Sequence, residues 1–450
     1  MYNKFNKLTL AAAVSAAVFA SQAHAGGYQI NEQSVSGQGY SHAGRSSNVH
    51  DATIVYGNPA GMSFLDRAQI TVGGTYLHVN TDVNNATSGR SLETPTGSLP
   101  LGSVTGTNEG DMVPGTLVPF AFYAQPVNEQ LAFGFGVYAP FGSKTEYEGG
   151  FEGRNQGDYT EVKVMTAQPT VSYRFNEQWG VGAGITYNRV DGELRRQVPV
   201  AVGQAANGAP IITEVDSRVK GDDDAWGYNL GVIYQPVPET TFGLTYRSKV
   251  DFNLDGNFSA SSPVLDQLGI GTVTDTAALD LTTPETVNFS VTQQMSDNLK
   301  LMFGASWSRW SRFDQILVTG TEREEITNEQ QNYSNAWAFA TGGEYQLTPE
   351  LALRAGLALD FTPTQDATRS VRIPSDDRRI FSLGAGWSPT PDLTLDFAYS
   401  YLTERSTQVD QTKTDSFTVA GQQTPPITST YSAGYKNEAH GFGAQLTYRF

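Results

Sequence analysis

The sequence has 450 residues, of which 46 are acidic and 29 are basic, and its formal net charge of -17 argues against nucleic acid as the main partner. It contains no cysteine, which excludes a disulfide scaffold and any cysteine-ligated metal site. No segment has the roughly 18 consecutive apolar residues that a membrane-spanning helix requires. Length alone suggests two or three soluble domains, and the strand pattern described below replaces that estimate.

The first 25 residues have the pattern of a secretory signal peptide. Lys4 and Lys7 are followed by an apolar run over residues 8–20 and by the small-x-small cleavage site Ala23-His24-Ala25. We therefore expect residues 1–25 to be removed and the mature chain to leave the cytoplasm. A secreted chain without cysteine suits a Gram-negative envelope. A soluble periplasmic protein is the alternative that the strand pattern has to decide.

Residues 68–450 have the alternation that is typical of strands. Near the end, Phe442, Leu446 and Phe450 fall on one face, and Gly443 and Gln445 on the other. A soluble β-sandwich also alternates, but here the segments are often about ten residues or longer and aromatic residues cluster near their ends. The pattern predicts an all-β transmembrane barrel of the cell outer membrane. Its aromatic last strand, closing in Phe450, resembles the signal that the barrel assembly machinery reads.

Short and long connections alternate along this region and predict the number of strands. Six turns are short and fall at 126–130, 176–178, 235–240, 295–298, 348–350 and 388–392. Seven longer polar segments lie between them, at about 80–116, 141–159, 195–214, 256–277, 316–332, 361–376 and 403–436. These connections predict a 14-stranded antiparallel barrel with both ends on the short-turn side. A closed barrel also satisfies every backbone hydrogen bond in lipid.

Residues 26–67 do not fit the barrel wall, because they are rich in Gly, Ser and Asn and poor in apolar residues. The lumen of a 14-stranded barrel is too wide for its own side chains to fill. We therefore expect this segment to form a plug, or hatch, inside the lumen, with a disordered periplasmic tail as the alternative. The sequence Gly57-Asn58-Pro59 favours a structured turn, since proline fixes its own φ and restricts the residue before it.

Three motifs are informative when taken together: residues 27–32 (GYQINE), the triplet Asn58-Pro59-Ala60 and residues 373–378 (IPSDDR). They resemble the FadL family of outer-membrane transporters for long-chain fatty acids, whose relatives carry aromatic hydrocarbons such as toluene. The resemblance implies that the triplet marks a lumenal hatch and that the protein is a monomer. One departure is Ser375, which stands where the family often has an acid.

The resemblance also implies that the third strand, residues 131–141, kinks inward and opens a lateral gap in the wall. Pro140 predicts a kink independently of the family, because proline cannot donate a ladder hydrogen bond. The residues expected at this opening are Tyr138, Ala139, Pro140, Phe141 and Gly142.

An apolar ligand needs a chain of apolar pockets, where each buried methylene gains roughly 0.8 kcal/mol. Unusually apolar residues in the third and fourth long segments form either an external groove, as the resemblance implies, or a lid in which they pack on each other: Val198, Val200, Ile211, Leu265 and Ile270. The resemblance places a second pocket at the start of the hatch, with Gly27, Tyr28 and Ile30. Arg378 pairs either with a substrate carboxylate or with Asp376 or Asp377, and we favour the acidic partner.

The sequence predicts energy-independent uptake of a hydrophobic compound by a protein that is not an enzyme and needs no cofactor or metal. Long-chain fatty acid is the favoured substrate, and aromatic hydrocarbon is the alternative. A general porin would need an open lumen, and a hydrolase would need more than the pair His50-Asp51, which fits a polar contact in the plug. The run Asp222-Asp223-Asp224 indicates either a divalent ion shared with lipopolysaccharide or a solvated strand end. Outer-membrane lipid and lipopolysaccharide are the expected surroundings.

Overall fold

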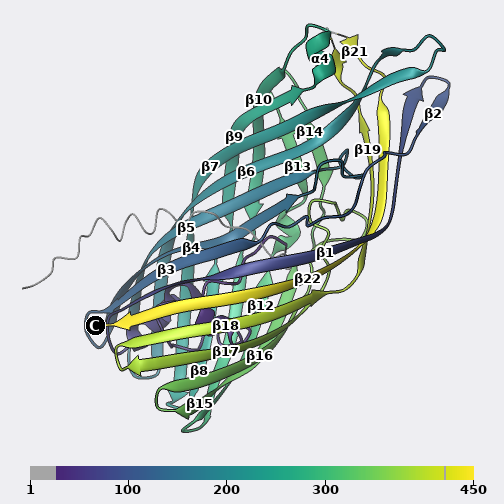
Figure 1. The fold of residues 1–450 in the computed structure, drawn as a ribbon. Helices are drawn as coiled ribbons and strands as arrows, with labels where there is room; N and C mark the ends of the chain where they lie inside the picture. Colours follow the sequence, from purple (N-terminus) through teal and green to yellow (C-terminus); the bar gives the residue numbers. More distant parts are fainter. Residues whose placement is uncertain (1–26, 420–421) are drawn as a thin grey trace, which may run out of the picture.

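The computed structural model describes residues 27–419 and 422–450, so the expected signal peptide lies outside the described residues. Twenty strands form one antiparallel sheet that closes on itself, since β1 (Gln69–Thr94) pairs with both β3 (Thr116–Pro126) and β22 (Ile427–Arg449). Figure 1 shows the resulting barrel. The chain runs from one end of the barrel to the other 14 times, and each such passage is here called a crossing. This number confirms the predicted 14-stranded antiparallel barrel.

Some crossings consist of one strand and others of two strands in succession. Besides β1, β3 and β22, the single-strand crossings are β4 (Leu131–Glu146), β5 (Tyr159–Arg174), β6 (Trp179–Gln204), β7 (Pro210–Val237), β16 (Leu351–Asp360) and β17 (Arg378–Thr390). The interrupted crossings are β8 (Thr240–Arg247) with β9 (Val250–Ser261), β10 (Val273–Thr283) with β11 (Thr286–Ser296), β12 (Leu299–Ser308) with β13 (Gln315–Thr319), β14 (Thr327–Gln330) with β15 (Ala336–Thr348), and β18 (Leu393–Glu404) with β19 (Thr407–Asp415). Smaller strands outside these crossings are β2 (Gly97–Gly102), which forms a hairpin with β1, and the pair β20 (Thr418–Val419) and β21 (Gln422–Gln423).

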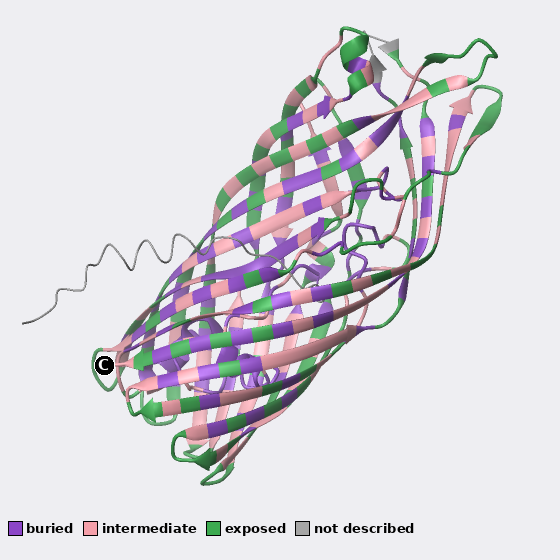
Figure 2. Ribbon diagram, viewed as in Figure 1, coloured by how far each residue is buried: buried purple, intermediate pink, exposed green. Residues whose placement is uncertain are grey.

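Side chains alternate between the lumen and the outside along each crossing, as Figure 2 shows by the banding of buried and exposed residues. Large apolar side chains are exposed on the outer face, among them Leu230, Phe303 and Phe381. Such a surface is stable in lipid and not in water. None of the helices in the described ranges has the length and apolar character required to cross a membrane.

The strands run further toward the long-loop end of the barrel than the sequence predicts. β6 and β7 have 26 and 28 residues, and their register continues to Gln204 opposite Pro210. Most of the predicted loop 195–214 is therefore strand. Apolar residues alternate with polar ones only in the part of the wall that faces lipid. The backbone hydrogen bonds between β6 and β7 continue beyond that part, because they do not depend on apolar side chains. Polarity alone cannot distinguish such a strand from a loop.

Residues 27–67, here called the hatch, lie within the ring of strands, where Figure 1 draws them in purple. The hatch contains α2 (Val35–Gln38), α3 (Ile54–Gly57) and the 3-10 helix η1 (Pro59–Phe64). Asn58 caps η1 through Ala60 N–H and donates from Nδ2 to the carbonyl oxygen of Val232 in β7 at 2.9 Å. A Cβ on Gly231 would lie 2.0 Å from Asn58 Oδ1, so a glycine in the wall permits this close approach.

Two further helices lie at the edge of the barrel wall. The 3-10 helix η2 (Trp310–Arg312) connects β12 to β13 and buries Trp310 completely. The short helix α4 (Pro263–Gln267) follows β9, and the side chain of its N-cap Ser262 accepts a hydrogen bond from Leu265 N–H.

Candidate functional site

The wall opens where β4, the third crossing, bends away from β3. The β3–β4 ladder runs from Pro126 opposite Ala132 to Phe120 opposite Tyr138, and within the described residues it goes no further. β4 continues beside β5 as far as Glu146, but one extra residue interrupts the register between Tyr138 and Phe141. Pro140 lies in this bulge, where its missing N–H has no ladder partner to lose. The ladders are thus interrupted at the residues where the sequence predicted a kink, and the passage of a ligand between β3 and β4 stays a prediction.

The start of the hatch covers the open edge of β4. Ile30 N–H donates to the carbonyl oxygen of Pro140 at 2.9 Å, and Gly142 N–H donates to the carbonyl oxygen of Tyr28 at 2.8 Å. Gln33 Nε2 donates to the carbonyl oxygen of Ala139 at 2.9 Å. Residues 28–30 thus supply the hydrogen bonds that β3 does not make at this level.

Tyr28 is held in a cluster of aromatic rings between the hatch and the wall. Its ring makes edge-on contacts with Phe141, Trp310 and Phe313 at centroid distances of 6.0, 4.7 and 5.5 Å. The neighbouring Gly27 has a φ of +68°, and a Cβ there would lie 2.6 Å from the Trp310 ring. Only glycine fits at this position without moving the tryptophan.

An apolar cavity begins at Tyr28 and extends along the inner face of the wall. Its empty volume is about 770 Å³, including space open to solvent, and its apolar lining includes Val162, Leu194, Val219, Leu254, Leu281 and Ile316. Tyr28, Gln331 and Arg372 are polar residues of the same lining. Among the described residues, Tyr28 OH and Gln331 Nε2 are buried without a hydrogen-bond partner. Burial raises the pKa of Tyr28 well above its usual value, so its hydroxyl stays a donor.

Arg372 gives one border of the apolar cavity a positive character. Its Nε lies 2.9 Å from Glu329 Oε2, and Glu329 Oε1 also accepts from Lys413 Nζ at 2.7 Å. One carboxylate is therefore shared between two cations.

The predicted apolar residues of the long segments pack together at the long-loop end. Val198, Val200 and Leu265 are buried in one cluster with Phe258 and Val318, and Ile270 packs against it. Ile211 is 47% exposed. Most of these side chains therefore contact each other, as the lid alternative describes, and only Ile211 offers a large apolar surface to the outside.

Arg378 pairs in the wall, but with a different carboxylate from those considered. Its Nε lies 2.7 Å from Glu404 Oε1, and both side chains are buried. Asp376 instead pairs with Arg369, and Asp377 accepts a hydrogen bond from Thr362 N–H. Glu404 ends the neighbouring strand β18, directly opposite Arg378 in the β17–β18 hairpin, and the sequence missed it because the register of this hairpin shifts between Trp387 and Thr390.

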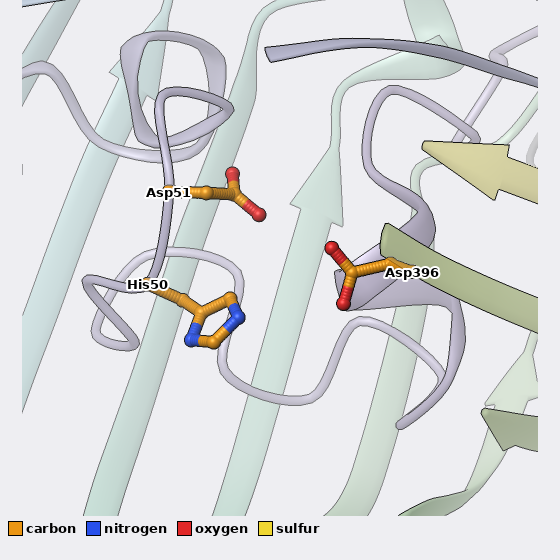
Figure 3. A group of neighbouring side chains, drawn as sticks. All are labelled: His50, Asp51 and Asp396. Carbon is orange, nitrogen blue, oxygen red and sulfur yellow. The ribbon is translucent and has the colours of Figure 1, made fainter. Parts of the chain in front are cut away.

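His50 and Asp51 form part of a polar network between the hatch and the wall. Figure 3 shows both facing Asp396 of β18, and their ligand atoms lie within 4.8 Å of one another. Arg354 donates to Asp396 at 2.5 Å and to Glu344 at 2.6 Å, and its Nη2 lies 3.1 Å from His50 Nε2. A guanidinium occupies the place where a metal ion or a substrate would sit. The arrangement fits the expected polar contact in the plug.

The acidic run lies in the middle of β7 and is paired with β6, so it is not a strand end. Asp222 and Asp224 are exposed, whereas Asp223 accepts a hydrogen bond from Asn253 N–H. Arg189 lies 2.7 Å from Asp222 and 3.2 Å from Asp224, and all three side chains are half-exposed. A divalent ion at this run stays a prediction.

The sequence did not single out Trp310, Gln331 or Arg372. The one available signal is that Arg372 directly precedes the Ile373-Pro374 pair. The other two contact Tyr28 or its cavity only because β12 and β14 are interrupted near this level.

The model for the family described as outer membrane protein transport protein (OMPP1/FadL/TodX) matches residues 16–450. The chain is 28% identical to outer membrane protein P1 of Haemophilus influenzae, over 99% of this chain and 100% of that protein. It is 26% identical to the long-chain fatty acid transport protein of Escherichia coli strain K12, over 90% and 94%.

Solved structures share the fold. A FadL homologue of Pseudomonas aeruginosa matches with a TM-score of 0.79 at 23% identity, over 94% of this chain and 99% of that one. The toluene transporter TbuX of Ralstonia pickettii matches with a TM-score of 0.62 at 16% identity, over 92% and 99%. The barrel, the hatch contacts and these matches agree: the chain belongs to the OMPP1/FadL/TodX family of outer-membrane transport proteins for hydrophobic compounds.

Proposed function

We propose that this transporter takes up long-chain fatty acids and that its apolar cavity binds them. The observation that carries the proposal is the pair of unpartnered buried donors, Tyr28 OH and Gln331 Nε2, at a cavity that is mostly apolar and that Arg372 and Lys220 border. The lining also contains Glu161 and Glu193, and Glu193 is already paired with Arg195 and Arg218. A buried donor without a partner carries a desolvation cost, which a ligand acceptor removes. A carboxylate provides only acceptors, and a hydrocarbon provides none.

The proposed path follows the elements that surround the cavity. The tail of the fatty acid enters the apolar cavity, where each methylene gains roughly 0.8 kcal/mol relative to water. Residues 27–30 of the hatch then move away from β4, and the ligand leaves sideways through the gap beyond Tyr138. The movement breaks the two backbone hydrogen bonds of Tyr28 and Ile30. Passage is diffusive, because the gain on entry is reversed on exit.

The names of the relatives support two substrate classes. The Escherichia coli relative is named a long-chain fatty acid transport protein, and the Ralstonia pickettii structure is a toluene transporter. Aromatic hydrocarbon is the second candidate here, and the ring cluster of Tyr28, Trp310 and Phe313 favours it, since edge-on contacts with a ligand ring gain energy.

The test compares a fatty acid with its neutral alcohol analogue in binding to the purified, detergent-solubilised protein. We expect the acid to bind more tightly, and both Tyr28→Phe and Gln331→Met to weaken acid binding more than alcohol binding, because a hydrogen bond to a carboxylate is stronger than one to a neutral hydroxyl. Tyr333→Phe is the matched control, because it removes an equally buried, unpartnered hydroxyl of the same ring cluster that does not line the cavity.

Deletion of residues 26–28 from the mature chain tests the role of the hatch in the same assay. Equal affinity for acid and alcohol would reject the fatty-acid assignment and favour neutral hydrocarbons. No binding of either ligand, together with steady ion conductance in a planar bilayer, would reject the transporter path and favour an open pore.

A further inference from the structure

A second, polar cavity lies on the other side of the first hatch residues. Tyr28 lines the apolar cavity, whereas Gln29 and Asn31 line this one, together with serine, asparagine and alanine residues from β11, β12 and β15–β18. The same lining also includes Phe289, Trp337, Phe339 and Ile380, and the cavity is called polar here for the charged and hydroxyl groups that face it. Its empty volume is about 900 Å³, including space open to solvent. Neighbouring residues of the hatch thus face two different cavities, Tyr28 the apolar one and Gln29 and Asn31 the other, while Ile30 packs with Leu77, Val118 and Ala139.

The wall of the polar cavity retains surface that water can reach. Ser306, Ala338 and Ala358 line the cavity, and all three are only partly buried although they face into a closed barrel. Their small side chains leave room between the wall and the hatch. Ser308 Oγ donates to Gln29 Oε1 at 3.0 Å, so the hatch touches this wall through a polar contact.

Three charged side chains line the polar cavity: Glu32, Arg45 and Asp360. Within the described residues, none of them has an oppositely charged group within 4.0 Å. Glu32 accepts from its neighbour Asn31 N–H, and Arg45 donates to the carbonyl oxygen of Asn31 at 3.2 Å. Asp360 is 7% exposed and makes no hydrogen bond with the described residues through its carboxylate.

The neighbouring arginine does not neutralise Asp360 directly. Arg378 lies opposite Asp360 in the β16–β17 ladder, but its guanidinium pairs with Glu404. Arg45 lies over the ring of Tyr56 at 5.7 Å. The carboxylates of Glu32 and Asp360 therefore face the cavity without an ion-pair partner. The guanidinium of Arg45 also faces it, but this group already contacts Asn31 and Tyr56 of the hatch. Buried charges of this kind require water or a ligand.

We propose that the polar cavity is a hydrated compartment that binds a small organic cation with an ammonium group, held between Glu32 and Asp360. The ammonium protons find acceptors in the two carboxylates and in the hydroxyl and amide oxygens of the lining. This site is independent of fatty-acid binding, because its lining and its chemistry differ from those of the apolar cavity.

The absence of cysteine from the chain makes a direct test available. Single variants Ser306→Cys and Ala338→Cys are treated with 2-aminoethyl methanethiosulfonate, which carries an ammonium group, and with the anionic 2-sulfonatoethyl reagent. The measured quantity is the rate of modification by the cationic reagent divided by the rate with the anionic reagent. Asn176→Cys, in an exposed short turn, gives this ratio for a cysteine in free solution. We expect the ratio to be about tenfold or more higher for the cavity cysteines than for the turn cysteine.

The carboxylates are tested by adding Glu32→Gln or Asp360→Asn to each cysteine variant, and each change is expected to bring the ratio toward that of the turn. The measurement is made at about pH 8, because burial raises the pKa of Glu32. Ethylammonium chloride is also expected to slow modification relative to sodium chloride at the same ionic strength.

Two results would overturn the proposal. One is a cavity cysteine that neither reagent modifies, which would mean that the compartment is closed to water. The other is a reactivity ratio equal to that of the turn, together with no protection by ethylammonium, which would mean that the cavity is wet but has no cation site. The heat-dependent gel shift of the folded barrel verifies that each variant has folded.

Discussion

The carbonyl oxygen of Tyr28 accepts a hydrogen bond from Gly142 N–H at 2.8 Å, while the side chain of Tyr28 lines the apolar cavity. One residue thus touches both the binding space and the open edge of β4. A ligand that displaces the Tyr28 ring also strains this hydrogen bond, because the residue has little freedom between Trp310 and Phe141. We therefore expect occupation of the cavity and opening of the wall to be coupled.

Deleting Pro140 should close the lateral gap. The deletion removes the one extra residue between Tyr138 and Phe141, so that the β4–β5 register becomes continuous and β4 can approach β3 again. We expect uptake of labelled fatty acid by cells to fall to the level of cells without the protein, while the barrel still folds.

Pro169→Ala is the control for this deletion, because Pro169 lies in the neighbouring strand opposite Phe135, where the register is regular. Undiminished uptake after deletion of Pro140 would mean that the ligand leaves by another route.

Gly27→Val should displace the start of the hatch. The substitution forces a β-branched residue to a φ of +68° and places its Cβ 2.6 Å from the Trp310 ring. The backbone strain alone costs about 1–3 kcal/mol, and the clash adds to it. We expect faster hydrogen exchange at the amides of Ile30 and Gly142.

Gly208→Val is the control for the Gly27 substitution, because it produces backbone strain at a positive φ without a clash against a neighbouring side chain. Gly208 has a φ of +80°, but nothing lies within 4 Å of the Cβ it would gain. If both variants leave the exchange at Ile30 unchanged, the ring of Trp310 is not what holds the hatch in place.

The sequence predicted the features that depend on local pattern. Alternation gave the crossings, the spacing of short turns gave their number, and Pro140 gave the kink, because each is a property of adjacent residues. Arg378 and Glu404 are direct partners in the β17–β18 hairpin, and the irregularity near its turn, between Trp387 and Thr390, hides that register from the sequence. The pair Arg372–Glu329 was missed because Arg372 lies in a long connection whose path the sequence does not define. The ends of β6 and β7 were missed because polar strands above the lipid lack the apolar alternation.

Arg354→Met should destabilise the packing of the hatch strongly. Arg354 is buried between Glu344 and Asp396 and also contacts His50, so its loss leaves Asp396 without an ion-pair partner and Glu344 with Lys300 alone. Breaking a buried pair in this way costs about 3–5 kcal/mol. We expect a lower denaturant midpoint of unfolding in detergent.

Arg189→Met is the matched comparison for Arg354, because it removes a half-exposed arginine that also contacts two carboxylates, Asp222 and Asp224. Exposed pairs contribute about 0–1 kcal/mol. Similar losses in the two variants would contradict a specific role for the buried network.

Docking of the hatch should weaken as the pH falls. Burial lowers the pKa of His42 and of His50, so in the folded protein both bind protons only at a lower pH than in the unfolded chain, where they bind protons below about pH 6.5. Stability is therefore lost progressively from that pH downward. Although burial opposes it, His50 and the hydrogen bonds from Thr53 and Ser36 lower the pKa of Asp51. Asp51 therefore adds a further loss below about pH 4.

Hydrogen exchange of the hatch amides, corrected for the intrinsic effect of pH, measures this dependence. We expect protection to fall between about pH 7 and pH 5, and His42→Gln with His50→Gln to flatten this part of the profile while the decrease below about pH 4 remains. Asp51→Asn should remove the acidic decrease and leave the first one in place. An unchanged profile in the histidine variants would assign the whole dependence to carboxylates, because no other group of the hatch titrates near neutral pH in the unfolded chain.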